Sequence, residues 1–96
     1  MDTNEASPGD LARRFKALSS GTRIRVLRLL KDRSLCVGAL AARLGITQSA
    51  VSQHLQVLSS AGLVEAERRG YYTHYRLSEE GLQACARAID ELARGA

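Results

Sequence analysis

The sequence predicts a mainly α-helical fold with one small β-hairpin, and three observations predict it. Residues 37–61 read as two short helices around a tight turn, where Gly45 supplies the left-handed backbone. Residues 63–77 form two alternating runs around Gly70, which is typical of a hairpin. Apolar residues recur every three or four positions over residues 82–93, which indicates a long last helix. Together these elements predict a winged helix-turn-helix of about five helices and a two-stranded wing.

The length of 96 residues predicts one folded domain. Residues 1–9 are small and polar, so we expect a disordered tail there and a single winged helix-turn-helix domain over residues 10–96. No apolar run approaches the roughly 20 residues that cross a bilayer, and the acidic, polar start does not read as a signal peptide. We therefore expect a cytoplasmic protein with no membrane partner, in which the two cysteines do not form a structural disulfide.

Two helices are expected before the helix-turn-helix. The first covers residues 10–18, with Asp10 as its N-cap and an apolar face of Leu11, Phe15 and Leu18. Ser20 can cap a second helix that extends to about Asp32, and its wide apolar face predicts a buried, central position. Residues 33–36 then form a short extended connection.

The second helix of the helix-turn-helix is expected to carry the DNA contacts. Thr47 can cap this helix, and its apolar stripe is Val51, Leu55 and Leu58. The opposite face is polar and uncharged, and it carries Ser49, Ser52, Gln53 and Gln56. Such side chains can exchange hydrogen bonds with base edges in a major groove.

The net charge of +4 is concentrated near this helix. Against a single acid, Asp32, residues 12–33 hold a basic belt of Arg13, Arg14, Lys16, Arg23, Arg25, Arg28, Lys31 and Arg33. Arg68 and Arg69 lie at the predicted hairpin tip, where they can contact phosphates or a minor groove. A belt beside a polar helix favours a polyanionic partner; the alternative is that these cations only solvate helix faces and a hairpin tip.

The last helix is predicted to pack against a second copy of the chain. Ser78 can cap this helix, whose apolar stripe includes Leu82, Cys85, Ile89 and Leu92. So small a domain offers no obvious cover for the whole stripe. A dimer would place two reading helices about 34 Å apart, which matches successive major grooves.

Residues 35–77 resemble the arsenic-repressor-type (ArsR/SmtB) family of winged-helix regulators. The resemblance is carried by LGITQSAVSQHLQVL, GLV and GYYTHYRL, and more weakly by ALSSGTRIRVLRLL. It implies a homodimer, joined by its first and last helices, that represses transcription from a partly palindromic operator and is released by an inducer. By position, it implies that the DNA-facing residues are Gln48, Ser49, Ser52, Gln53 and Arg69.

The metal sites implied by the resemblance are incomplete. A Cys-x-Cys pair is reduced to Cys36-Val37-Gly38. On the last helix only Glu79 is an acceptable ligand, because Gly81 and Leu92 or their neighbours occupy the histidine positions. We therefore expect no required cofactor and no complete metal site. A thiophilic metal or metalloid at Cys36 would need further sulfurs, shared with Cys85 or across subunits.

The two cysteines are the candidate sensor thiols. Cys36 is expected at a helix N-terminus, beside Arg33, where a reactive thiolate is favoured. The alternative for Cys36 is a small residue that caps the helix as serine would. For Cys85 the alternative is a small buried hydrophobe at the dimer seam.

No catalytic constellation is visible in the sequence. There is no glycine-rich phosphate loop, and neither His54 nor His74 has a nucleophile and carboxylate nearby. We therefore predict that the protein is not an enzyme. Two alternatives to an inducible repressor stay open: a protein-docking winged helix, which would show exposed apolar residues on the reading face, and a repressor without any small-molecule inducer.

Overall fold

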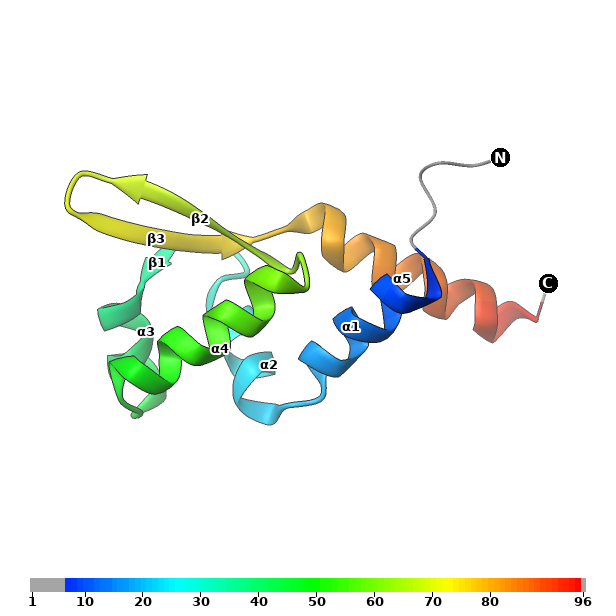
Figure 1. Ribbon diagram of the computed structural model, residues 1–96, viewed down its shortest axis with the longest axis horizontal. Coiled ribbons are helices and arrows are strands. Elements are labelled where there is room, and N and C mark those ends of the chain that lie inside the picture. The colour runs from blue at the N-terminus through cyan, green and yellow to red at the C-terminus, as the bar shows by residue number, and fades with distance from the viewer. Residues whose placement is uncertain (1–6, 96) are drawn as a thin grey trace.

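The structure is a computed structural model that describes residues 7–95 of the chain. Within that range the elements are α1 (Pro8–Leu18), α2 (Gly21–Leu29), β1 (Leu35–Cys36), α3 (Val37–Leu44), α4 (Gln48–Ser60), β2 (Val64–Arg69), β3 (Tyr72–Leu77) and α5 (Glu79–Arg94). The fold is elongated, at 45 × 26 × 22 Å, with the hairpin of β2 and β3 at one end and α5 reaching the other (Figure 1). The predicted winged helix-turn-helix is confirmed.

Local capping sets the bounds of the helix-turn-helix. Gly45 ends α3 in a left-handed conformation with φ 69°, which only glycine adopts without steric cost. Thr47 Oγ1 then accepts a hydrogen bond from the Ala50 backbone N–H at 3.1 Å and caps α4. The limits of α3, the turn and the start of α4 agree with the sequence prediction.

The core lies where α2, α3 and α4 meet the inner face of the sheet. The most deeply buried large side chains are Val26, Leu30, Leu40, Val51, Leu55, Leu58 and Leu63. They come from α2 and its C-cap, from both helices of the helix-turn-helix, and from the loop before β2. The reading helix is therefore anchored along its whole inner face.

The sheet has three strands in the order β1-β3-β2, whereas the sequence predicted a wing of two. The β2–β3 hairpin pairs from Val64↔Leu77 to Arg69↔Tyr72. The extended segment before α3 adds a short antiparallel strand, with Leu35 opposite Tyr75 and Cys36 opposite His74. This third strand ties the base of the wing to the start of α3.

Two helix bounds differ from the prediction near the N-terminus. α1 begins at Pro8, inside the predicted tail, and its N-cap is Ser7 in place of Asp10. Ser7 Oγ accepts a hydrogen bond from the Asp10 backbone N–H at 3.1 Å, and proline suits a first helical position because its missing N–H has no partner there. The rest of the predicted tail, residues 1–6, lies outside the described residues. α2 ends at Leu29, before the predicted limit of Asp32, and Leu30 is its C-cap.

α1, the end of α4 and the start of α5 meet in one junction. Arg14 Nε donates to the Ala61 carbonyl at the C-cap of α4, at 3.1 Å. Ser78 Oγ caps α5 by accepting from the Gly81 backbone N–H at 3.2 Å. Gly81 is buried directly against the Gly62 carbonyl oxygen, so closely that a Cβ at position 81 would collide with it. Across residues 7–95, no helix is long and apolar enough to cross a membrane.

Candidate nucleic-acid interface

The five predicted reading side chains share the exposed face of α4. Val51, Leu55 and Leu58 are buried on the opposite face. All five reading residues are exposed: Gln48, Ser49, Ser52, Gln53 and Gln56. This face is uncharged and rich in donors and acceptors, which is the chemistry that reads base edges. The structure brings these residues together, and their role in reading DNA stays a prediction.

The helix before the turn holds α4 in place. α3 packs against α4 with the buried side chains of Leu40 and Leu44. The Gln48 amide lies over the first turn of α3, where a Cβ added to Gly38 would be 3.7 Å from Gln48 Nε2. The position of the first reading residue therefore depends on the position of α3.

The two wing arginines lie on opposite faces of the hairpin. Arg68 is paired with Thr73 and Arg69 with Tyr72 in the strand register, next to the tip glycine Gly70. Because side chains alternate along a strand, Arg68 shares the face of Val64, which packs into the core. Arg68 Nε donates to the Gly70 carbonyl at 3.3 Å. Arg69 lies on the outer face and forms an ion pair with Glu67 at 3.2 Å.

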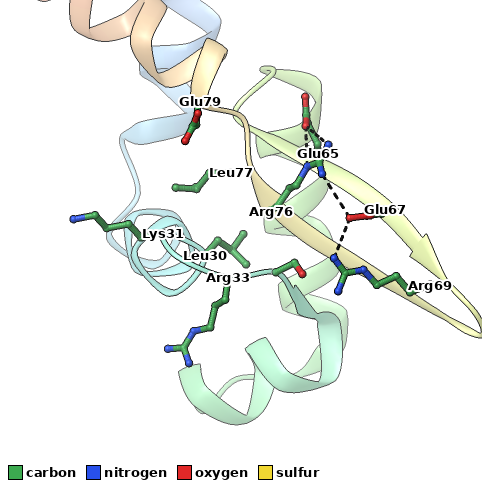
Figure 2. A pocket seen from close by; sticks show the side chains of 10 residues that line it. Leu30, Lys31, Arg33, Glu65, Glu67, Arg69, Arg76, Leu77 and Glu79 are labelled. Carbon is green, nitrogen blue, oxygen red and sulfur yellow. Dashed lines mark hydrogen bonds and ion pairs between the residues drawn. The ribbon is translucent and has the colours of Figure 1, made fainter.

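Figure 2 shows that Arg69 is the end of an ion-pair ladder on the outer face of the sheet. Arg76 joins Glu65 at 3.1 Å and Glu67 at 3.6 Å. The ladder forms one wall of an open cavity of about 500 Å³. Other cavity-lining residues are Leu30, Lys31, Arg33, Ser34, Leu77 and Glu79. Charges of both signs line this cavity, so much of its charge is internally compensated.

One member of the basic belt braces the fold. Arg23 Nε donates to the Ala17 carbonyl at 2.6 Å, and Arg23 Nη1 lies 3.4 Å from His54 Nδ1 on α4. The end of α1, the start of α2 and the side of α4 are thereby joined. His54 is accordingly a partnered residue at the flank of the apolar stripe of α4.

A second cavity, which we call the α1–α4 groove, opens directly beside the reading face. It has a volume of about 480 Å³ and lies between α1, the start of α2 and the second half of α4. Its lining consists of Arg13, Lys16, Ala17, Arg23, Gln53, Gln56, Val57 and Ser60. The groove was not predicted, because its two walls come from residues 13–23 and 53–60, which are distant in the chain.

Cys36 lies at the N-cap of α3 and is partly exposed. Its side chain makes no capping hydrogen bond, so the alternative that it caps α3 as serine would is wrong. The β1–β3 register sets Cys36 opposite His74. His74 Nδ1 is buried and has no hydrogen-bond partner within the described part of the chain. This juxtaposition was not predicted, because β1 itself was not recognised as a strand.

Cys85 has the surroundings of a packing residue. It is 4% exposed in the core. Burial raises the pKa of the Cys85 thiol, and the nearby positive charge of Arg14 offsets part of that rise. A thiol held in its neutral form is a weak nucleophile. Over residues 7–95 of one chain, no three His, Cys, Asp or Glu side chains come together in a way that could hold a metal ion.

The stripe on α5 is covered only in its first half. Leu82 packs against the core and Cys85 is part of it. Further along the helix, Ile89 is 54% exposed and Leu92 is 80% exposed. The four residues predicted for the dimer interface thus divide into two that contact the chain's own core and two that face outward.

Comparisons with known proteins agree with this architecture. Residues 20–66 match the family model described as "Bacterial regulatory protein, arsR family". The chain is 44% identical over 92 residues to the HTH-type transcriptional regulator CmtR of Mycobacterium bovis, covering 96% of this chain and 75% of CmtR.

Two further curated relatives come from other bacteria. The transcriptional activator HlyU of Vibrio cholerae is 36% identical over 78 residues, covering 81% of this chain and 72% of HlyU. The transcriptional repressor SdpR of Bacillus subtilis is 35% identical over 69 residues, covering 72% of this chain and 77% of SdpR.

The fold itself is similar to solved structures. One is the homodimeric winged helix-turn-helix DNA-binding domain Mb0332 from Mycobacterium bovis, described as a possible ArsR-family transcriptional regulator. It superposes with a TM-score of 0.74 at 34% identity, over 92% of this chain and 85% of that domain.

Proposed function

Because this chain belongs to the arsR family of bacterial regulatory proteins, we propose that it is a homodimeric repressor that binds an operator in duplex DNA. The family consists of transcriptional regulators, and the protein is not an enzyme. The observation that carries the proposal is the exposed, uncharged face of α4, which is anchored by a buried stripe and flanked by a basic hairpin. We place the protein in the cytoplasm, where its operator would be.

In this proposal α4 and the wing have different tasks. Gln and Ser side chains on α4 form hydrogen bonds with base edges, and these contacts depend on sequence. Arg68 and Arg69 contact phosphates, which positions the protein on any duplex. Arg68 has the freer charge, because Arg69 is already paired with Glu67 at 3.2 Å.

The dimer is supported by the uncovered half of α5. Ile89 and Leu92 are large apolar side chains that face outward at the far end of the molecule, and a second copy of the same helix would cover them. Mb0332, a structural relative, is homodimeric. Two copies would present two α4 helices to successive major grooves, which calls for a partly palindromic operator.

The sign of regulation is proposed as repression. Relatives of both kinds exist, since HlyU is named an activator and SdpR a repressor. The two assigned surfaces of this small fold, α4 with the wing and α5, bind DNA and the second subunit in our proposal. A bound dimer would then act by covering the operator. A promoter–reporter assay with and without the protein tests the sign, because activation would raise the reporter signal.

We further propose that an inducer acts through Cys36. A thiol-reactive species is the first choice, because Cys36 is partly exposed, lies opposite His74 and begins the helix that contacts Gln48. An adduct there would displace α3, and a displacement of about 1 Å is enough to break hydrogen bonds between α4 and bases. A thiophilic metal or metalloid is the second choice and would need Cys36 and Cys85 to converge within one chain or across subunits.

The inducer proposal is tested by measuring DNA release under peroxide, polysulfide, arsenite, antimonite, cadmium and zinc. Parent protein, Cys36→Ser and Cys85→Ser are compared at the same concentrations. We expect Cys36→Ser alone to retain DNA where the parent releases it. Equal release from parent and Cys36→Ser would reject this route, and no response from any protein would leave a repressor governed by its own abundance.

The base-reading proposal is tested on duplexes enriched by repeated selection from a random pool. We expect Gln53→Ala to weaken binding to the selected duplex by about 1–3 kcal/mol, with little effect on random DNA. Arg68→Ala and Arg69→Ala should weaken binding to both duplexes alike. If Gln53→Ala and Ser52→Ala both leave the affinity for the selected duplex intact, α4 is not the reading helix.

A further inference from the structure

The two cavities described above differ in the charges of their linings. The cavity beside the sheet holds Glu65, Glu67 and Glu79 together with its cations, and ion pairs join several of them. The α1–α4 groove is lined by three cations and no carboxylate: Arg13, Lys16 and Arg23. Its positive charge therefore calls for an anion from outside.

The cations of the groove are held in different ways. Arg23 is fixed by its bonds to the Ala17 carbonyl and His54. Arg13 is restrained by Asp10, which lies outside the groove lining, through an ion pair of 2.8 Å. Lys16 takes part in no ion pair of the described residues. Its ammonium group is the charge that remains available to a ligand.

The groove also has apolar surface and joins the reading face. Ala17 is 2% exposed at its base, and Val57 is 41% exposed on its α4 side. Gln53 and Gln56 belong both to the groove lining and to the predicted reading face. A ligand that fits this surface has a negatively charged group and an apolar part. It is also joined directly to the bases that α4 would contact.

We propose that the α1–α4 groove binds the sugar–phosphate backbone of the DNA strand that borders the major groove entered by α4. A phosphate would interact with Lys16, with support from Arg13 and Arg23, and the adjoining deoxyribose would lie against Val57. This inference rests on the proposed function, since it presupposes that α4 binds duplex DNA. It adds a third contact region, in which cations of α1 and α2 act together with the second half of α4.

The position of the groove gives this contact a second consequence. One wall belongs to α1, and α1 packs against α5, the proposed dimer helix. A phosphate held between α1 and α4 would therefore link the DNA to the element that orients the two subunits. A substitution that shifts α5 would then change the binding of the DNA backbone as well as the spacing of the two α4 helices.

The test is the salt dependence of binding, measured by fluorescence anisotropy on selected and random duplexes. Each phosphate contact contributes about 0.9 to the slope of log affinity against log salt. A dimer carries two copies of Lys16, so we expect Lys16→Gln to lower that slope by about 1.8 and to weaken binding roughly sixtyfold at 0.1 M salt on both duplexes. Lys31→Gln is the matched control, because it removes the same charge from the lining of the other cavity.

A second pair of variants tests the groove without removing a cation. Val57→Asp places a carboxylate where the backbone would lie, whereas Val57→Asn has nearly the same shape and no charge. We expect Val57→Asp to weaken binding to both duplexes at least tenfold and Val57→Asn to have a much smaller effect. Circular dichroism and thermal melts confirm that each variant is folded, which the partial exposure of Val57 favours.

The outcomes separate this inference from the proposed function. Parent protein that binds no duplex would reject the proposed function itself. Parent protein that binds DNA, with Lys16→Gln and Lys31→Gln giving equal salt slopes, would overturn the groove alone. Titration with octanoate, read from backbone amide resonances of α1 and α4, tests a free organic anion. Millimolar octanoate binding together with an unchanged slope for Lys16→Gln would assign the groove to such an anion and overturn the DNA contact.

Discussion

α4 and α5 carry the same apolar pattern, but their surroundings differ. The stripe of α4 is buried within one chain, and Leu55 is 1% exposed. The stripe of α5 begins at Leu82 and Cys85, which pack with the core, and ends at Leu92, which is 80% exposed. A periodic stripe therefore predicts which face of a helix is apolar, and it does not predict whether the covering surface belongs to the same chain.

The two stripes therefore contribute to different equilibria: α4 to the folding of the monomer, and the distal half of α5 to association with another surface. α4 contributes to the stability of the folded monomer, because its stripe is part of the core. The distal half of α5 can contribute only when another surface covers it, so its contribution would depend on protein concentration. Variants of the two stripes should separate these contributions.

The largest effect is expected from matched truncations of the two stripes. Leu55→Ala should lower the free energy of unfolding by about 2–5 kcal/mol, because it leaves a cavity in a packed core. Leu92→Ala should change the monomer by less than about 0.5 kcal/mol. Urea denaturation measures both, at a concentration where light scattering shows a monomer. Equal losses for the two variants would mean that Leu92 is covered within its own chain.

A charge on the distal stripe should separate assembly from folding. Leu92→Asp is expected to leave the monomer folded and to abolish dimerisation, because an aspartate would lose its hydration at an apolar seam. Without a second reading helix, affinity for a two-site operator should fall by about a hundredfold. Light scattering measures the oligomeric state, and fluorescence anisotropy measures the affinity for the operator. A Leu92→Asp protein that remains dimeric would place the interface elsewhere.

Removing the N-caps of α4 and α5 should produce a smaller difference in stability. Thr47→Ala should cost about 1 kcal/mol of stability, because its cap is exposed and water can replace the lost bond. Ser78→Ala should cost more, up to about 2 kcal/mol, because the Gly81 N–H that it accepts from is buried. Thermal unfolding of the two variants provides the comparison, and a costlier Thr47→Ala would contradict it.

The smallest effect concerns pH. Burial raises the pKa of Cys85 in the folded state, so the folded protein holds this proton more tightly than the unfolded chain. The resulting stability is complete below the unfolded pKa of about 8.5 and is lost as pH rises through the raised folded pKa. Unfolding of parent and Cys85→Ala between pH 7 and 10 should show a steeper decline for the parent. Parallel curves would mean that Cys85 does not titrate differently on folding.

The sequence prediction was more accurate for features set by neighbouring residues than for features set by residues distant in the chain. The bounds of α3 and the start of α4 were predicted, because Gly45 and Thr47 act on residues within one turn. The strand β1 was missed as a strand, since its pairing with Tyr75 and His74 spans about 40 positions. The start of α1 was also misplaced, although Ser7 and Pro8 are local signals of a helix start.

The candidate interface also has one part that local sequence patterns predicted and another that depends on tertiary packing. The polar face of α4 follows from helical periodicity, which identified Ser49, Ser52, Gln53 and Gln56 in advance, and the resemblance added Gln48. The tasks of the belt cations do not follow from periodicity. Arg23 braces α4 through His54, and Arg14 holds the C-cap of α4, whereas Lys16 lines the groove. Only the packing of α1 against α4 distinguishes these roles.

The contact between Gly81 and Gly62 restricts which residues position 81 can accommodate. The resemblance implies that position 81 or one of its neighbours corresponds to a histidine ligand in metal-binding members of the family. Here any side chain at position 81 would meet the Gly62 carbonyl oxygen, and Gly62 has φ 74°, which also disfavours replacement. A histidine at position 81 would therefore require the α4–β2 loop to be rebuilt first. A single mutation therefore cannot place any side chain at position 81 without displacing the loop.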